Sequence, residues 1–417
     1  MDLQNWLSET PKYTTFRLNK LKKFNSNNLE QYLKAQSKEL NCDLTPEFYL
    51  LKPDCLILKQ WPETLPMEKT GKEVIVDALC AAAVLRGAHV FAPGVMGLPT
   101  SCQLNDRVDI YGDLEGKCKK GLKVEYTGKK QYVGCGYLKM LRYELFDNRV
   151  QPGGIAIQTI LPASRLPVVN ESLYPSGDVL LQNLPSIVCG WVVNAQPGEY
   201  VLDMCAAPGN KTTHLAEMSN DKAFITAIDK TPQKVAKIKD SCNIQGVTCV
   251  NVYAFDSTKC HTKDSNSKDS GPPFPSNSFD KVLLDAPCSG LGQRPQLLNK
   301  MTPKMIQSYK FLQRKLFAAA VEVLKENGKL VYSTCTITDD ENEGMVVWAL
   351  DKFPFLKLIP AMPLLGGPGL PNKGLNDVQR LMVQRFGQEK DPLRPVDDIY
   401  RDSIGFFIAA FTKVPQP

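Results

Sequence analysis

Two cysteines directly follow short apolar runs that we expect to be buried strands. Cys288 lies in "LLDAPCSG" at residues 283–290, and Cys335 lies in "VYSTCT" at residues 331–336. Cysteine is a strong nucleophile even when only a few per cent of it is thiolate near pH 7. An aspartate, Asp285, stands three residues before the first of these cysteines. The pattern therefore suggests covalent catalysis with an acidic group close by.

This set of groups suits the methylation of a cytosine ring at carbon 5. That carbon takes no methyl group unaided, but a thiolate that adds to carbon 6 turns it into an enamine-like nucleophile. Ring nitrogen 3 then needs a proton or a strong hydrogen bond, which Asp285 could supply, and the thiol must afterwards be eliminated. One of the two cysteines could attack while the other assists release, and the residues alone do not decide which. The alternative is a pair of buried core thiols, the commonest fate of cysteine, but the flanking Pro, Ser and Thr favour chemistry.

A second motif, "DMCAAPGNKT" at residues 203–212, predicts a ligand-binding loop between a strand and a helix. Backbone N–H groups at such a helix start face a ligand. A P-loop is excluded because Cys205 and Asn210 stand where its two glycines belong. The other interpretation is an S-adenosylmethionine loop, supported by Asp229 and Asp256 at the ends of the next two strands, where acids can bind ribose hydroxyls and an adenine amino group. Acids at strand ends are often only helix caps, so the shared register of Asp229, Asp256 and Asp285 counts for more than each one alone.

The elements that position these residues alternate between strand and helix from about residue 179 onward. Strands are expected at 199–205, 223–229, 247–256, 279–287, 329–336 and 403–413. Helices are expected at 212–219, 231–244 and 307–328, the last one stopped by Asn327-Gly328. This order predicts an α/β fold with a doubly wound, mostly parallel sheet, in which ligands bind beyond the carboxyl ends of the strands. Surface loops are expected at 261–278 and 366–378.

Residues 71–160 follow a different pattern. Short β-type runs are punctuated by Gly and Pro, and one helix-like segment, "EVIVDALCAAAVL", occupies residues 73–85. This pattern predicts a small, mainly-β, barrel-like domain.

Composition excludes several classes of protein. The 13 cysteines are scattered without CxxC pairs, and with only three histidines they argue against a zinc site and a disulfide framework. We therefore expect reduced thiols, a cytoplasmic protein and no bound metal. No apolar stretch reaches the roughly 18 residues of a membrane span, so no membrane partner is expected. The net charge of +6 is too small to prove an anionic partner, although four lysines crowd the segment 117–123.

Five segments resemble the Sun (Fmu) family of RNA cytosine-5 methyltransferases. They are "LDMCAAPGNKTTHLA", "LLDAPCSGLGQRP", "LQRKLFAAAVEVLKENGKLVYSTCTITDDENE", "DSIGFFIAAF" and, near the N-terminus, "TTFRLNKLK" at 14–22. The resemblance implies a class I, Rossmann-like methyltransferase fold with S-adenosylmethionine as the cofactor. It also implies that Cys335 attacks the cytosine, that Cys288 promotes release of the product, and that Lys211 and Asp285 act on the base.

The cofactor-lining residues that the resemblance implies are Cys205, Ala206, Ala207, Pro208, Gly209, Asn210, Lys211, Asp229, Asp256 and Asp285. The family usually reads Pro-Gly-Gly-Lys where this chain has Asn210 in place of the second glycine. Asparagine is the non-glycine residue that best tolerates left-handed backbone angles. We therefore expect the loop to keep its shape and the substitution to change the affinity for the cofactor, not the reaction.

The segment "AVLRGAHVFAPGV" at 83–95 is similar to a PUA domain, an RNA-binding barrel. The implied organisation is an N-terminal part of the methyltransferase region at 1–70, an inserted PUA domain at 71–160 and the catalytic domain at 161–417. Phosphate contacts are expected from Arg86, Lys119, Lys120 and Lys123. For the lysines the alternative is a solvated surface, and for Arg86 a hydrogen bond inside the barrel.

A Sun-type catalytic domain with an inserted PUA domain resembles the transfer-RNA-modifying type of the family. The implied substrate is the tRNA cytosine just before the discriminator base, and the implied contacts are the acceptor stem and CCA end. We expect the enzyme to be a monomer. Three alternatives stay open: messenger RNA sites that mimic the tRNA 3′ end, a catalytically silent RNA-binding protein, and the same chemistry on DNA.

Overall fold

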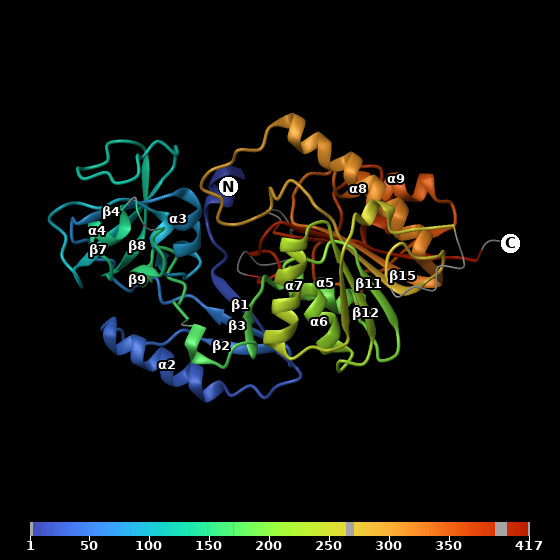
Figure 1. Ribbon diagram of the computed structural model, residues 1–417, viewed down its shortest axis with the longest axis horizontal. Helices are drawn as coiled ribbons and strands as arrows, with labels where there is room; N and C mark the ends of the chain where they lie inside the picture. Colours follow the sequence, from blue (N-terminus) through green and yellow to red (C-terminus); the bar gives the residue numbers. More distant parts are fainter. Residues whose placement is uncertain are drawn as a thin grey trace.

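The structure is a computed structural model that describes residues 3–147, 149, 151–169, 171–263, 271–387 and 398–415. Within these residues the paired strands form three sheets (Figure 1). The largest sheet and its helices make up the right-hand part of the molecule in Figure 1. A small body of β-strands lies at the left, and the third sheet lies between the two.

The largest sheet is doubly wound, as the sequence predicts. Its strand order is β13-β12-β11-β14-β15-β18-β16, and β17 pairs with β18. The first five strands are parallel, whereas β18 is antiparallel to its neighbours. The chain enters at the central β11, winds outward to β13 and then returns to β14, so the order reverses between β11 and β14. The strands are β11 (Tyr200–Asp203), β12 (Phe224–Asp229), β13 (Val250–Ala254), β14 (Phe279–Asp285), β15 (Leu324–Thr334), β16 (Leu356–Ile359), β17 (Gln384–Phe386) and β18 (Phe406–Lys413).

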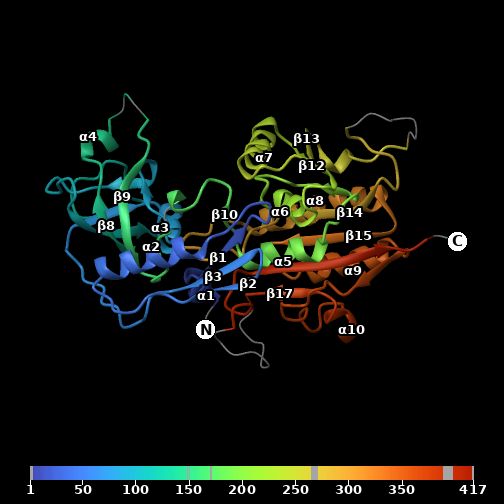
Figure 2. The same ribbon diagram turned by 90° about the horizontal axis from the view of Figure 1, so that it is seen from below.

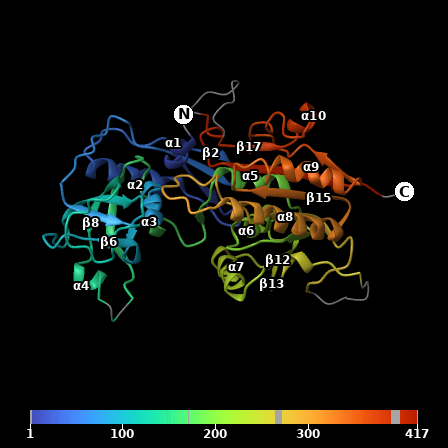
Figure 3. The same cartoon turned by 90° about the horizontal axis from the view of Figure 1, so that it is seen from above.

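Helices cover both faces of this sheet. Helices α5 (Leu184–Val193), α6 (Asn210–Met218) and α7 (Pro232–Gln245) lie on one face, and α8 (Pro303–Val323) and α9 (Glu343–Lys352) on the other (Figures 2 and 3). Consecutive strand residues enter opposite cores: Val331 packs with α5 and α6, and Tyr332 packs with α8 and α9. Because both faces are buried, the strands are almost continuously apolar, which is typical of a parallel sheet.

The prediction for the long helix before β15 is wrong at both ends. The helix begins at Pro303, where the Thr302 side chain accepts a hydrogen bond from the Met305 N–H and proline occupies the first turn. It ends at Val323, and the predicted stop signal falls inside β15, where Asn327 adopts a φ of 60°. An Asn-Gly pair can bend a strand as well as end a helix.

The predicted helix at 73–85 is also partly wrong. Residues Glu73–Val76 form strand β4, in agreement with the strand preference of β-branched valine and isoleucine. Helix α3 (Ala78–Leu85) begins only after Asp77, whose side chain accepts a hydrogen bond from the Cys80 N–H.

The small β body contains six strands in the order β5-β9-β8-β7-β4-β6. They are β4, β5 (Val90–Phe91), β6 (Val95–Gly97), β7 (Arg107–Asp113), β8 (Lys130–Leu138) and β9 (Ile155–Pro162). The edge strands β5 and β6 are joined by the single turn η1 (Ala92–Gly94), so the chain itself closes the sheet into a ring. Helix α3 packs its buried face into the core of this ring, while α4 (Arg142–Leu145) lies on it.

The third sheet was not predicted from the sequence. Its order is β10-β1-β3-β2, with β1 (Tyr13–Leu18), β2 (Phe48–Lys52), β3 (Cys55–Lys59) and β10 (Val179–Leu181). Helix α2 (Ser26–Glu39) covers it through Leu29 and Leu33, and the short α1 (Leu3–Ser8) precedes it. Because β1 pairs with β10, the small β body is an excursion between two strands of one sheet.

The predicted loop at 366–378 forms a bridge between Gly367 and Arg385 and is otherwise irregular up to Asn376, which caps α10 (Asp377–Arg380). Residues 264–270 of the other predicted loop lie outside the described residues, and the rest of it includes a short bridge between His261 and Phe274. None of the described helices has the length and apolarity needed to cross a membrane. Groups of three or more metal-ligating side chains are likewise absent from the described part of the chain.

Candidate active site

The two cysteines meet because their strands are neighbours in register. Strands β14 and β15 are parallel, and Asp285 pairs with Ser333 at their carboxyl ends. Cys288 follows three residues after Asp285, and Cys335 two residues after Ser333. The two Sγ atoms lie 3.4 Å apart, and both side chains are half-buried rather than sealed in the core.

The thiol pair is electrostatically asymmetric. A hydrogen bond from Cys288 lowers the pKa of Cys335 to about 7, helped by Gln293 and by the positive charge of Lys211 and opposed by burial and Asp285. The same hydrogen bond, together with burial, raises the pKa of Cys288 well above its usual value. Near neutral pH, Cys335 is therefore partly thiolate, while Cys288 keeps its proton.

An ion pair lies beside the thiols. Lys211, from the first turn of α6, places its Nζ 2.7 Å from Asp285 Oδ2, and the Ser333 hydroxyl donates to Oδ1 at 2.6 Å. Burial acts to lower the pKa of Lys211, but the charge of Asp285 outweighs it and the net shift is upward. The site thus offers a fixed ammonium group and a carboxylate next to a nucleophilic sulfur.

These pKa shifts predict the pH dependence of thiol labelling. Iodoacetamide is expected to alkylate Cys335 at a rate that rises through about pH 7, because the thiolate forms above the lowered pKa. Quantitative mass spectrometry of the Cys335 peptide between about pH 5 and pH 9 measures this profile. In Cys288→Ala the midpoint should move up toward that of an ordinary thiol, about 8.5. A wild-type midpoint already at that value would contradict the asymmetry.

The cofactor loop turns at Gly209 and not at the unusual asparagine. Gly209 has a φ of 111°, and a Cβ atom there would approach Ser241 of α7 to 3.1 Å. Asn210 is the first residue of α6, with helical backbone angles. The expectation that Asn210 needs left-handed tolerance is therefore wrong. The loop keeps its shape because helical geometry suits asparagine as well as glycine.

Two of the predicted cofactor-binding aspartates, Asp229 and Asp256, lie at the carboxyl ends of β12 and β13. Asp229 is buried, and its Oδ2 accepts the Ala207 N–H of the loop at 3.1 Å. Asp256 follows β13 and caps the turn η3 (Ser257–Lys259): its Oδ1 accepts from the Thr258 N–H and hydroxyl, which lowers the pKa of Asp256. The helix-cap alternative therefore holds for Asp256.

These residues fit S-adenosylmethionine. Asp203, at the end of β11, accepts from Thr212 through Oδ2, while its buried Oδ1 has no hydrogen-bond partner among the described residues. Burial raises the pKa of Asp203 to about 7. The start of α6 offers N–H groups to a carboxylate, and Asp229 offers oxygens to ribose hydroxyls. A bound cofactor would therefore find both donors and acceptors at this edge.

Sequence reasoning missed a buried residue that holds the start of α6, directly after the cofactor loop, in place. Arg17, in β1, is fully buried and forms an ion pair with Glu217 of α6 at 3.0 Å. It also donates to Thr213 at 2.9 Å and to the carbonyl oxygen of Asn210. The remaining acceptors are Gln182 at 2.8 Å and Gln245 at 2.5 Å. An arginine between Phe16 and Leu18 in the strand "YTTFRL" was the sequence signal that could have revealed it.

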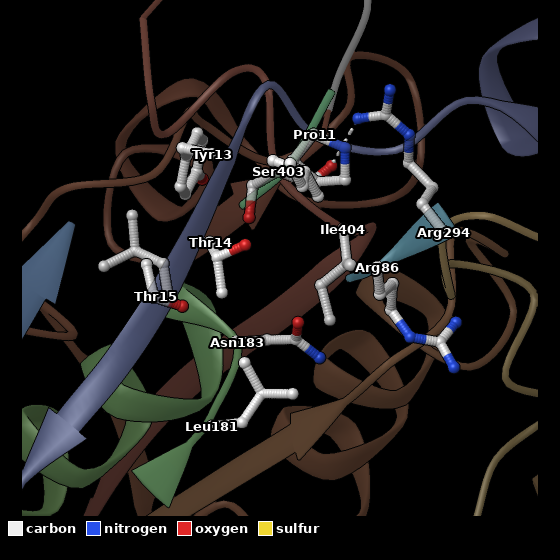
Figure 4. Close-up of a pocket in the computed structure, with 12 residues that line it drawn as sticks. Pro11, Tyr13, Thr14, Thr15, Arg86, Leu181, Asn183, Arg294, Ser403 and Ile404 are labelled. Carbon is white, nitrogen blue, oxygen red and sulfur yellow. Dashed lines mark hydrogen bonds between the residues drawn. The ribbon is translucent and has the colours of Figure 1, made fainter. Parts of the chain in front are cut away.

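The residues proposed to contact RNA fall in two places. Arg86 ends α3 and lines a cavity of about 1000 Å³ that Asn210, Gly290 and Gln293 also line, so it faces the active-site side and not the barrel interior. Its side chain is exposed, and its guanidinium has no hydrogen bond or ion pair to any described residue. Figure 4 shows it beside a second, smaller pocket, on the same side as Arg294.

The lysines share a loop with one of the residues that line this cavity. Lys119, Lys120 and Lys123 are exposed on the loop between β7 and β8. Gly116, at the start of that loop, lines the cavity directly. The structure therefore places Arg86 on the lining of the cavity, together with Gly290 and Gln293, and leaves the three lysines outside that lining.

Comparisons with known proteins agree with this geometry. The family model described as 16S rRNA methyltransferase RsmB/F matches residues 191–373. The human protein named tRNA (cytosine(72)-C(5))-methyltransferase NSUN6 is 42% identical, over 98% of this chain and 90% of its own. A Pyrococcus horikoshii protein named tRNA (cytosine(72)-C(5))-methyltransferase is 30% identical, over 98% of this chain and 91% of its own.

A solved structure supports the same relationship. The crystal structure of NSun6 from Pyrococcus horikoshii with SFG, an S-adenosylmethionine analogue, matches with a TM-score of 0.73 and 30% identity. The match covers 99% of this chain and 94% of the other. The resemblance seen in the sequence motifs therefore extends over the whole chain. The protein is a member of the RsmB/F (Sun) family of S-adenosylmethionine-dependent RNA cytosine-C5 methyltransferases.

Proposed function

We propose that this enzyme methylates the acceptor-stem cytosine of tRNA that lies just before the discriminator base, with Cys335 as the nucleophile. The observation that carries the proposal is the thiol pair at 3.4 Å beside the Lys211–Asp285 ion pair, since each group has a role in cytosine chemistry. The substrate is supported by the two full-length relatives, which are named for cytosine 72 of tRNA.

Attack begins from the thiolate of Cys335. Its Sγ bonds to carbon 6 of the cytosine, and the electrons of the carbon 5–carbon 6 double bond move toward carbon 4 and nitrogen 3. As negative charge develops on nitrogen 3, the Lys211 ammonium group supplies the proton. Lys211 donates it to nitrogen 3 directly or passes it to Asp285, whose protonated carboxyl group then donates to nitrogen 3. Carbon 5 thereby becomes nucleophilic. Bound S-adenosylmethionine supplies the electrophilic methyl group.

Release reverses the attack and assigns a role to Cys288. Once Cys335 is bonded to carbon 6, its anion no longer holds the Cys288 proton, and Cys288 can lose that proton to water. The Cys288 thiolate then takes the proton from carbon 5. The electrons of that bond restore the ring double bond, and the carbon 6–sulfur bond breaks to return Cys335 as a thiolate.

We further propose that the small β body is a PUA-type RNA-binding domain, with limits near residues 71 and 160. The segments 1–70 and 161–417 then form the methyltransferase region on either side of it, which fits the pairing of β1 with β10. The cavity of about 1000 Å³ is lined both by α3 of this body and by residues 290–300 of the catalytic region. The acceptor stem and CCA end would lie along it, with a single enzyme copy per tRNA.

Positive charge on the small β body predicts which substitutions weaken RNA binding. A Lys119→Ala/Lys120→Ala variant should bind tRNA more weakly and show a shallower dependence of affinity on salt, by about one unit of slope for each phosphate that the variant no longer neutralises. Arg86→Ala should lose affinity as well, because Arg86 lines the cavity together with Gly290 and Gln293. Fluorescence anisotropy over a range of salt concentrations measures both affinities. Lys34→Ala on α2 is the matched control, and an unchanged slope in the double variant would remove those lysines from the interface.

The direct test of the proposed function is methyl transfer from labelled S-adenosylmethionine to defined nucleic acids. The enzyme should label a tRNA transcript and lose that activity when the cytosine before the discriminator base becomes uracil. Duplex DNA of the same sequence should remain unlabelled. Mapping of 5-methylcytosine in total RNA from cells with and without the enzyme then identifies further targets, including messenger RNA. The 13 free thiols fit a reducing compartment, which supports a cytoplasmic location.

A further inference from the structure

A fully buried carboxylate lies behind the two catalytic-site cysteines. Glu341, in the loop between β15 and α9, accepts four hydrogen bonds. Its donors are the Ser289 N–H at 3.0 Å, the Ser289 hydroxyl at 2.5 Å, the Gln313 amide at 2.9 Å and the Thr338 hydroxyl at 2.9 Å. A carboxylate has about four acceptor sites, so this one is saturated by protein donors. It is therefore not available to substrate or cofactor.

These hydrogen bonds connect Glu341 to the turn at residues 287–289 that carries Cys288, called here the Cys288 turn. Ser289 follows Cys288 in the chain, so two of the four hydrogen bonds hold the residue next to the thiol. Gln313 of α8 donates from the same amide to the carbonyl oxygen of Pro287 at 3.0 Å. Both neighbours of Cys288 are thus tied to Glu341, one directly and one through Gln313.

The Cys335 turn is held mainly by the next residue, Asn342. Its side chain accepts from the Thr334 hydroxyl at 2.6 Å and donates to the Thr336 carbonyl oxygen at 3.1 Å, one residue on either side of Cys335. The two turns are also joined directly, since the Ser289 and Thr336 hydroxyl oxygens lie 2.7 Å apart. Strand β15 gives Cys335 further support from the sheet, whereas Cys288 lies in a loop beyond β14.

We propose that Glu341 is a positioning residue that holds Cys288 against Cys335 for the release step. The inference rests on the proposed roles of the two cysteines. Attack needs only Cys335, which β15 and Asn342 keep in place. Release needs a second thiol close to the same ring, and the turn that carries this thiol is anchored on Glu341. A displacement of about 1 Å in a reacting group can cost about 100-fold in rate.

The test is a Glu341→Gln variant of the full-length enzyme, incubated with S-adenosylmethionine and tRNA. Glutamine keeps the size of the side chain but turns an –NH₂ group toward the donors, so the Cys288 turn loses its anchor. Turnover should fall about 100-fold, while a covalent enzyme–RNA complex that survives denaturing electrophoresis should accumulate. Glu326→Gln, an exposed carboxylate on β15, is the matched control and should behave as wild type.

Two further variants separate positioning from a merely structural role. Ser289→Ala removes the hydroxyl that bonds to both Glu341 and Thr336, and should also accumulate the complex. The double variant Cys288→Ala/Glu341→Gln should form as much covalent complex as Cys288→Ala alone, because both changes act on release and not on attack. Equal loss of turnover and of covalent complex in Glu341→Gln and Ser289→Ala would overturn the inference, as would wild-type turnover in both. If Cys288→Ala itself forms no complex, the proposed cysteine roles fail instead.

Discussion

A Cys288→Ala variant is expected to stop at a covalent enzyme–RNA complex. Cys335 can still attack carbon 6 and carbon 5 can still receive the methyl group, but no thiolate takes the carbon 5 proton. Each enzyme molecule should therefore carry one labelled RNA, and multiple turnover should disappear. Denaturing electrophoresis with labelled cofactor shows the shifted band, and mass spectrometry of the digested band locates the RNA on Cys335.

Removal of the attacking sulfur should have the opposite result. Cys335→Ala should yield neither the complex nor free methylated product. The Cys288 change removes a hydrogen-bond donor from Cys335 and so raises the pKa of Cys335. The two variants should therefore be compared at about pH 8.5, where an ordinary thiol is about half thiolate. Cys249→Ala, at a half-buried thiol on a different part of the sheet, serves as the control and should leave turnover intact. A complex that forms without Cys335 but not without Cys288 would reverse the assigned roles.

An Arg17→Met variant is expected to lose about 3–5 kcal/mol of folding stability, because Glu217 is left as a buried acid without its cation. Burial already raises the pKa of Glu217 to about 7 with Arg17 in place, so its charge is costly. The carbonyl oxygen of Asn210 and the side chain of Thr213 lose their donor as well. Affinity for S-adenosylmethionine should fall with stability, since both residues belong to the first turn after the cofactor loop. Urea unfolding and calorimetric titration measure the two quantities.

The double variant Arg17→Met/Glu217→Gln distinguishes the effect of the lost ion pair from the effect of lost side-chain packing. Removing the uncompensated acid should restore part of the lost stability. Lys34→Met breaks an exposed pair with Glu30 on α2 and should change stability by no more than about 0.5 kcal/mol. An Arg17→Met variant as stable as Lys34→Met would show that the buried network contributes little.

Local patterns in the sequence were sufficient to predict the doubly wound sheet and the residues that gather at its edge. Apolar runs and helical periodicity are local signals, and neighbouring parallel strands end together, so Asp285, Cys288 and Cys335 could be placed near one another from the sequence. The mainly-β character of the segment after residue 71 was equally local. The ends of α3 and α8 could not be predicted in this way, because valine-rich and Asn-Gly stretches serve strands as well as helices.

The buried hydrogen bonds and ion pairs that hold the site in place, in contrast, depend on long-range packing. Arg17 reaches α6, and Glu341 reaches the Cys288 turn, through contacts between residues far apart in the chain. The pairing of β1 with β10 and the opening beside Arg86 likewise arise between separate segments. Periodicity reports which face of an element is buried, but not which distant element covers it. Buried hydrogen-bond networks are therefore set by packing, and they were the part of this active site that the sequence left undetermined.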